Sequence, residues 1–124
     1  MTISNYAENK ILDAIFNATS FGLAGDPYVS LHTADPGETG ANEVTGGSYA
    51  RVQAGFDAAA SGATSNTGAI AFTGMPACTV THVAIWDAGA AGNCLWSGAL
   101  DASKVVNAGD TSNIAAGALD VTPD

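Results

Sequence analysis

The chain has 124 residues, and its twelve carboxylates against three basic residues give a formal net charge of -9. Proteins that bind nucleic acid or anionic lipid neutralise phosphates with clustered Lys and Arg side chains, whereas Lys10, Arg51 and Lys104 lie far apart in this sequence. We therefore expect no direct nucleic acid and no membrane among its partners. The length predicts a single domain that spans residues 1–124.

Residues 4–20 predict an amphipathic helix. Its apolar side chains recur at helical spacing on one face, and they are Ile11, Leu12, Ile15 and Phe16. Asn5 and Glu8 have the spacing of a capping box, with Ser4 as an alternative cap. No basic start and apolar run of a signal peptide precedes this segment, so we expect synthesis in a cytoplasm.

Residues 27–122 read as short strands joined by Gly-rich turns. The strands are predicted at 28–33, 49–56, 69–73, 79–86, 94–100, 104–106, 112–115 and 118–121. This pattern favours a mainly β fold, an antiparallel β-sandwich or flattened barrel, with one N-terminal amphipathic helix. Residues 79–86 are apolar on both faces, which predicts a central strand covered on both sides.

Ala and Gly are abundant, so the core must rely on a few large side chains. These are predicted to be Leu12, Ile15, Phe16, Leu31, Phe56, Phe72, Ile85, Trp86, Leu95 and Trp96. Cys78 and Cys94 are predicted to be buried free thiols. If residues 79–86 and 94–100 form a hairpin with Cys94 opposite Trp86, Cys78 lies roughly 25 Å away at about 3.3 Å per residue, too far for a disulfide.

The sequence offers little support for catalysis. His32 and His82 lie within predicted strands without metal-ligand spacing, and we expect hydrogen-bonded structural histidines. No nucleophile elbow or phosphate-binding glycine loop is present, and both cysteines have apolar surroundings that raise a thiol pKa. We therefore predict no catalytic residues, no cofactor, no metal and no enzyme activity.

The two tryptophans have two interpretations. Trp86 and Trp96 lie on neighbouring predicted strands and could form a platform on which a sugar stacks. In an Ala-rich core, large aromatic side chains more often fill the centre, and we favour core packing.

The segment from Leu31 to Arg51 is a strand followed by a long polar loop, and loops of this length in small domains usually bind something or pack on a neighbour. Arg51 is a candidate anchor that holds the loop through Asp35 or Glu43 by a charge-assisted hydrogen bond. The alternative is a solvated arginine whose ion pair contributes little. Candidate contact residues for a neighbouring protein are Asp35, Glu38, Asn42 and Tyr49.

Several motifs together resemble one protein family. They are Leu-His-Thr-Ala-Asp-Pro-Gly at 31–37, Glu-Val at 43–44, Gly-Gly-Ser-Tyr-Ala-Arg at 46–51, Thr-His-Val-Ala-Ile-Trp-Asp-Ala at 81–88, Leu-Trp-Ser-Gly-Ala-Leu at 95–100 and Asn-Ala-Gly-Asp-Thr at 107–111. The chain resembles the small virion proteins of tailed bacteriophages, known as capsid decoration (cement) proteins or tail fibre proteins. The resemblance implies a β-sandwich that works by contact and has no catalytic residues.

Within the virion, physical arguments favour one role. The chain has no collagen-like repeat, coiled-coil heptads or β-helical repeat, one of which a fibre shaft would need. Packaged DNA would repel its acidic surface. We therefore predict an outer capsid decoration protein that bridges subunits of the major capsid protein, as a homo-oligomer on the outer surface of a virion made in the host cytoplasm. The alternatives are a tail, tail-fibre or adaptor component, or a glycan-binding module.

Overall fold

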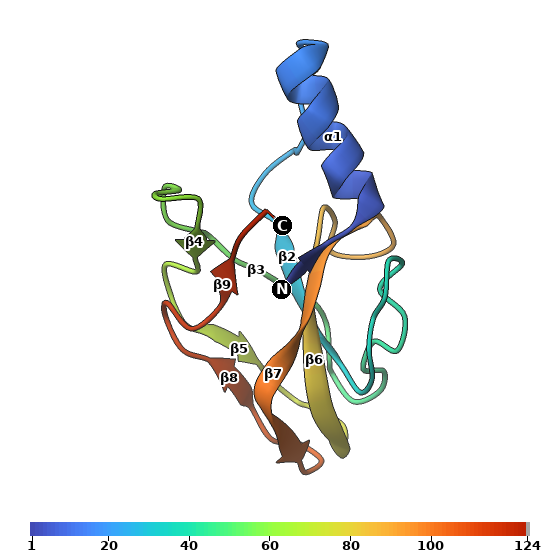
Figure 1. Cartoon of the computed structure of the whole chain (residues 1–124). Coiled ribbons are helices and arrows are strands. Elements are labelled where there is room, and N and C mark those ends of the chain that lie inside the picture. Colours follow the sequence, from blue (N-terminus) through green and yellow to red (C-terminus); the bar gives the residue numbers. More distant parts are fainter. Residues whose placement is uncertain (124) are drawn as a thin grey trace.

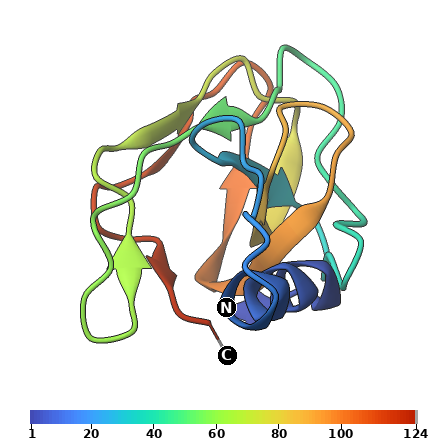
Figure 2. The same ribbon diagram turned by 90° about the horizontal axis from the view of Figure 1, so that it is seen from above.

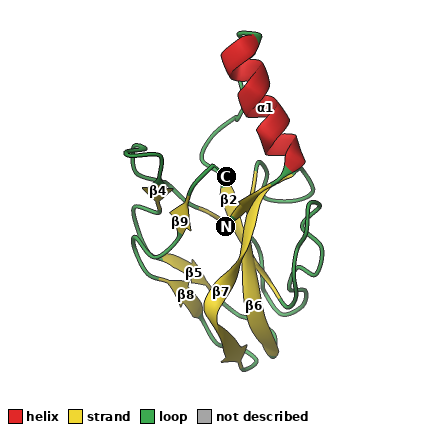
Figure 3. Cartoon of the chain, viewed as in Figure 1, coloured by secondary structure: helices red, strands yellow, loops and turns green. Residues whose placement is uncertain are grey.

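The computed structural model describes residues 1–123 and consists mainly of antiparallel strands, with one helix near the N-terminus (Figures 1 and 3). This confirms the predicted fold class. In chain order, the elements are β1 (Thr2–Ile3), α1 (Asn5–Phe16), β2 (Tyr28–His32), β3 (Val52–Gln53), β4 (Thr64–Ser65), β5 (Ile70–Phe72), β6 (Cys78–Trp86), β7 (Cys94–Val106), β8 (Ser112–Ile114) and β9 (Asp120–Val121).

The largest sheet has five strands in the order β1-β7-β6-β2-β3, and the pairs β4-β9 and β5-β8 form two small sheets. The central strand β6 pairs with β2 on one side and with β7 on the other. Cys94 lies opposite Trp86, which confirms the predicted hairpin register. β7 runs on to Val106, so the predicted strands 94–100 and 104–106 are one strand. The pairing of β6 with β7 shifts register between Val80 and His82 of β6, and again between Ile85 and Trp86.

Both faces of the five-stranded sheet are covered. On one face, apolar side chains of β2 and β6 pack against the two small sheets, which lie together on that side of the molecule (Figure 2). On the other face, a smaller cluster contains Ala84, Trp86, Cys94 and Tyr28. This second cluster lies under the loop at 33–51. The prediction of a strand covered on both sides is confirmed for residues 83–86, whereas Thr79 is exposed and Thr81 and His82 are only partly buried.

The helix is shorter than the predicted 4–20. Ser4 is its N-cap, and the Ser4 hydroxyl accepts a hydrogen bond from the Ala7 N–H; the alternative cap is thus the one used. The helix ends at Phe16 because the chain turns at Ala18, whose φ is 53°. No helix within residues 1–123 is long and apolar enough to cross a membrane.

The prediction that the apolar face of the helix joins the core is wrong for three of its four residues, although Ile11 is partly buried and packs against the core. Leu12, Ile15 and Phe16 are 51%, 67% and 76% exposed. The helix instead packs through Ala7, which is fully buried and lies roughly 140° around the helix axis from Leu12 at 100° per residue. Beyond its first turns the helix extends away from the strands (Figure 1), so its last turns have no core to join.

Other core predictions also need correction. Leu31, Phe72, Ile85, Trp86 and Leu95 are buried as predicted. Phe56 and Trp96 are only partly buried. Cys78 and Cys94 are free thiols, but Cys78 is half-buried instead of buried. Two short strands, β1 and β4, were not predicted, because two-residue strands leave no detectable alternation.

Candidate functional site

The loop at 33–51 extends the edge of the large sheet beyond the short strand β3. The Thr33 N–H donates to the Asn42 carbonyl at 3.1 Å, and the Val44 N–H donates to the Leu31 carbonyl at 2.9 Å. His32 and Glu43 form an isolated antiparallel bridge. The backbone of this loop is therefore held to β2 by ladder-type hydrogen bonds.

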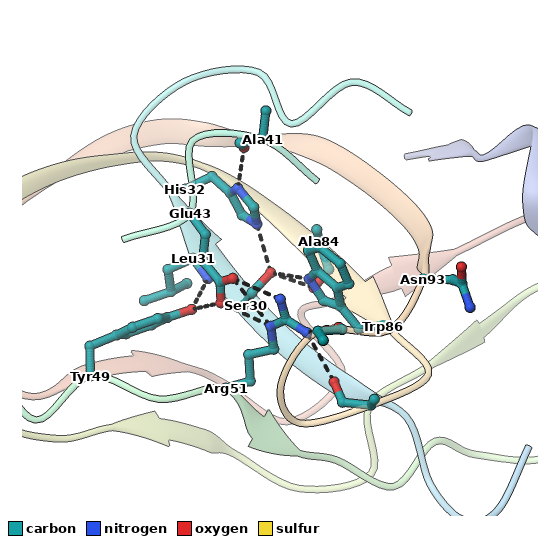
Figure 4. A network of polar contacts seen from close by, with 12 residues as sticks. Ser30, Leu31, His32, Ala41, Glu43, Tyr49, Arg51, Ala84, Trp86 and Asn93 are labelled. Atoms are coloured by element: carbon teal, nitrogen blue, oxygen red, sulfur yellow. Dashed lines mark hydrogen bonds and ion pairs between the residues drawn. The ribbon is translucent and has the colours of Figure 1, made fainter. Parts of the chain in front are cut away.

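Arg51 and Glu43 form a bidentate ion pair inside the loop (Figure 4). The Arg51 Nε donates to Glu43 Oε2 at 3.0 Å, and Nη2 donates to Oε1 at 2.9 Å. The two side chains are 8% and 21% exposed, so the arginine is not the solvated residue of the alternative interpretation. Such planar, two-bond pairs combine strength with fixed geometry.

Tyr49 completes the surroundings of the carboxylate. Its hydroxyl donates to Glu43 Oε2 at 2.9 Å and accepts from the Leu31 N–H at 3.0 Å. Burial alone would raise the pKa of the Glu43 carboxyl, but the hydrogen bonds from Arg51 and Tyr49 outweigh it and hold that pKa below its ordinary value. Burial raises the pKa of Tyr49, so its hydroxyl keeps the proton that it donates.

Arg51 also ties the loop to the turn between β6 and β7. Its Nη1 donates to the carbonyls of Ala88 at 3.1 Å and Ala91 at 2.8 Å. The guanidinium carbon lies 3.5 Å from the centre of the Trp86 ring, a cation–π contact. One side chain thus joins two segments that are about forty residues apart in sequence.

Gly40 packs directly against the indole of Trp86. A Cβ added at Gly40 would lie 2.2 Å from Trp86 Cζ2, and the φ of Gly40 is 75°. Only glycine combines this left-handed backbone with so close an approach. Trp86 is 5% exposed, so this ring is unavailable for a sugar platform with Trp96.

A chain of hydrogen bonds runs beneath Trp86. The indole Nε1 donates to Ser30 Oγ at 2.7 Å, and Ser30 Oγ lies 2.7 Å from His32 Nε2. His32 Nδ1 lies 2.7 Å from the Ala41 carbonyl, which can only accept. His32 Nδ1 therefore carries the proton, and Nε2 accepts from Ser30. Burial lowers the pKa of His32 despite its bond to Ala41, which favours this neutral form.

The other residues singled out in the loop lie apart from Arg51. The Asp35 carboxylate accepts from the Gly37 N–H, and the Asn42 amide donates to the Asp35 carbonyl. Glu38 accepts from the Asn5 N–H at 2.7 Å, so the loop holds the first turn of α1. The structure thus joins Glu43, but not Asp35, to Arg51. Asp35, Glu38 and Asn42 are exposed.

Sequence reasoning missed two members of the site, Ser30 and Gly40, and it did not connect Trp86 with Arg51. Ser30 and His32 alternate with Val29 and Leu31 along one strand, and this alternation was the signal that a second, partly polar face exists. Nothing in the sequence pairs Gly40 with Trp86, because their contact depends on how the loop folds back.

The arrangement offers structural cohesion more than reactive groups. Both ring nitrogens of His32 are held by hydrogen bonds. Burial raises the pKa of the Cys94 thiol to about 11, which disfavours the nucleophilic thiolate. Within residues 1–123, no three His, Cys, Asp or Glu side chains are grouped so that they could hold a metal ion.

Comparison with known families identifies the chain. Residues 2–122 match the family described as "Podophage GP4 fiber I protein gp80". The chain belongs to this family. The resemblance to small virion proteins of tailed phages is thereby confirmed, and the chain is a structural protein of a bacteriophage virion. No curated protein matches the chain as a relative.

Proposed function

We propose that this podophage fiber-family protein is a non-enzymatic component of the tail fibres, located at the outer surface of the virion. The single observation that carries this proposal is the family match over residues 2–122, whose description names a fiber protein. It favours the tail-fibre alternative over the capsid decoration role that the sequence suggested.

The architecture supports a role in contact. The loop at 33–51 is held by Arg51, Glu43 and Tyr49 from within, and its outward-facing residues Asp35, Glu38 and Asn42 are exposed. A loop whose exposed polar side chains are already held by hydrogen bonds within the chain loses little conformational entropy when a neighbour binds it. We therefore propose this surface as one contact region of the fibre.

Copy number and position in the virion distinguish the two structural roles. Quantitative mass spectrometry of purified virions measures the ratio of this chain to the major capsid protein. A tail-fibre component should be present in far fewer copies than the major capsid protein. In images of virions labelled at the C-terminus of this chain, the label should lie at the tail. Copies comparable in number to the major capsid protein, with label over the head, would instead support capsid decoration and overturn the proposal.

A further inference from the structure

The last turns of α1 present a cluster of large apolar side chains to solvent. We call Leu12, Ile15 and Phe16 the helix-tip cluster; their exposed fractions run from 51% to 76%. At 100° per residue, all three fall within roughly 100° of the helix circumference, so they form one continuous stripe. Contiguous apolar surface of this kind marks an interaction site on a soluble protein.

Charges near the cluster are few and balance each other. Residues 9–25 contain one basic residue, Lys10, and one acidic residue, Asp13, which lies beside Leu12; of the twelve carboxylates only Glu8 and Asp13 precede residue 26. The rest of the chain carries the remaining ten carboxylates against Arg51 and Lys104. Two copies of so acidic a protein repel each other over most of their surface, but much less where the helix tips meet.

The shape of the molecule permits such a meeting. The C-terminal half of α1 extends beyond the strands, so the last turns of the helix stand clear of the β-rich part of the molecule (Figure 1). The opposite side of the first turns is already occupied, because Ala7 is fully buried and Ser4 bonds to the carbonyl of Cys94 at 2.6 Å. The helix is therefore fixed at its base and free at its tip.

From these observations, we infer that the helix-tip cluster is a self-association surface whose occupant is the same cluster of a second copy of this chain. Each copy presents the same surface to the other, as a two-fold symmetric dimer requires. A basic partner would bind the acidic strands and loops and not the helix-tip cluster. The inference does not depend on whether the protein serves in the tail or on the capsid.

The test uses the purified full chain in sedimentation velocity over a wide concentration range. Phe16→Ser and Ile15→Ser should each weaken self-association roughly ten- to hundredfold, the effect expected from removing a large side chain from an apolar contact. Val105→Ser is the matched control, since Val105 is 75% exposed but lies in β7, outside the helix. It should leave self-association unchanged.

Salt gives a second readout. Because the contact is apolar while the net charge repels, added salt should strengthen self-association by screening. A wild-type chain that stays monomeric at every concentration would overturn the inference and leave the cluster to another virion protein. So would self-association that Phe16→Ser and Ile15→Ser leave intact, or that Val105→Ser weakens equally. Circular dichroism of each variant establishes that it remains folded.

Discussion

Replacing Arg51 by alanine tests whether one side chain holds the loop at 33–51 in place. The substitution removes three hydrogen bonds to the Glu43 carboxylate, the bonds to two carbonyls of the β6–β7 turn and the contact with Trp86. The Glu43 side chain, 21% exposed, is then left without its countercharge.

The size of the effect follows from that stranded carboxylate. Removing one partner of a buried ion pair costs about 3–5 kcal/mol, and the residual solvent contact of Glu43 favours the lower end, ~3 kcal/mol. This is a large part of the ~5–15 kcal/mol that stabilises a typical domain. Arg51→Lys should also destabilise, because a single ammonium cannot reproduce the planar fork that reaches Glu43 and both carbonyls.

Urea unfolding followed by tryptophan fluorescence and circular dichroism measures these free energies. In a double-mutant cycle with Glu43→Gln, the double variant should lose about 2 kcal/mol less than the sum of the single losses. Lys104→Ala, at an exposed position of β7, should change the free energy of unfolding by no more than about 0.5 kcal/mol. An Arg51→Ala variant as stable as the Lys104→Ala control, or strictly additive losses, would refute the reasoning.

Three further predictions address the same region. Gly40→Ala should lower the free energy of unfolding by about 3 kcal/mol, from left-handed strain plus overpacking against the indole of Trp86. Gly37→Ala is the control, because its φ is also positive but an added Cβ meets nothing within 4 Å; it should lower the free energy of unfolding by only about 1 kcal/mol. Equal losses in the two variants would contradict the close contact between Gly40 and Trp86. Because the pKa of His32 is held below its ordinary 6.5, stability should decline as pH falls below that value; His32→Gln should remove the decline in urea titrations, and a decline removed only by His82→Gln would count against the assignment. With a pKa of about 11, Cys94 should resist a thiol reagent at neutral pH until the chain unfolds, and rapid labelling of the native protein, mapped by mass spectrometry, would disprove its burial.

The fold class was predictable because strand signals depend on local alternation. Strand β6 could be placed from its two apolar faces, and the register of Cys94 against Trp86 followed from the length of the turn. The position of α1 could not be predicted in this way. Its residue pattern shows an apolar stripe that is expected to be buried. The pattern does not tell whether the stripe is buried against the same chain or against another one.

The site was predictable only in part, for a similar reason. Scarcity of cations made an ion pair between Arg51 and a nearby acid one of two open interpretations, and the choice among acids depended on backbone geometry. Along the sequence, Asp35 lies eight residues nearer than Glu43 to the end of β2, but its carboxylate accepts a hydrogen bond from Gly37 within its own turn. Trp86 contacts Arg51 and Gly40, which lie far from it in the sequence. Such long-range contacts cannot be read from a single sequence.

The pinning of the loop by Arg51 has a consequence for the dynamics of the molecule. An irregular segment of this length would ordinarily open by itself, and its amides would exchange with solvent far faster than those of the strands. Here the segment shares its hydrogen bonds with β2, with the β6–β7 turn and, through Glu38, with the start of α1. Opening it breaks all three attachments at once, so the N–H groups of Thr33 and Val44 should exchange only when the whole sheet unfolds.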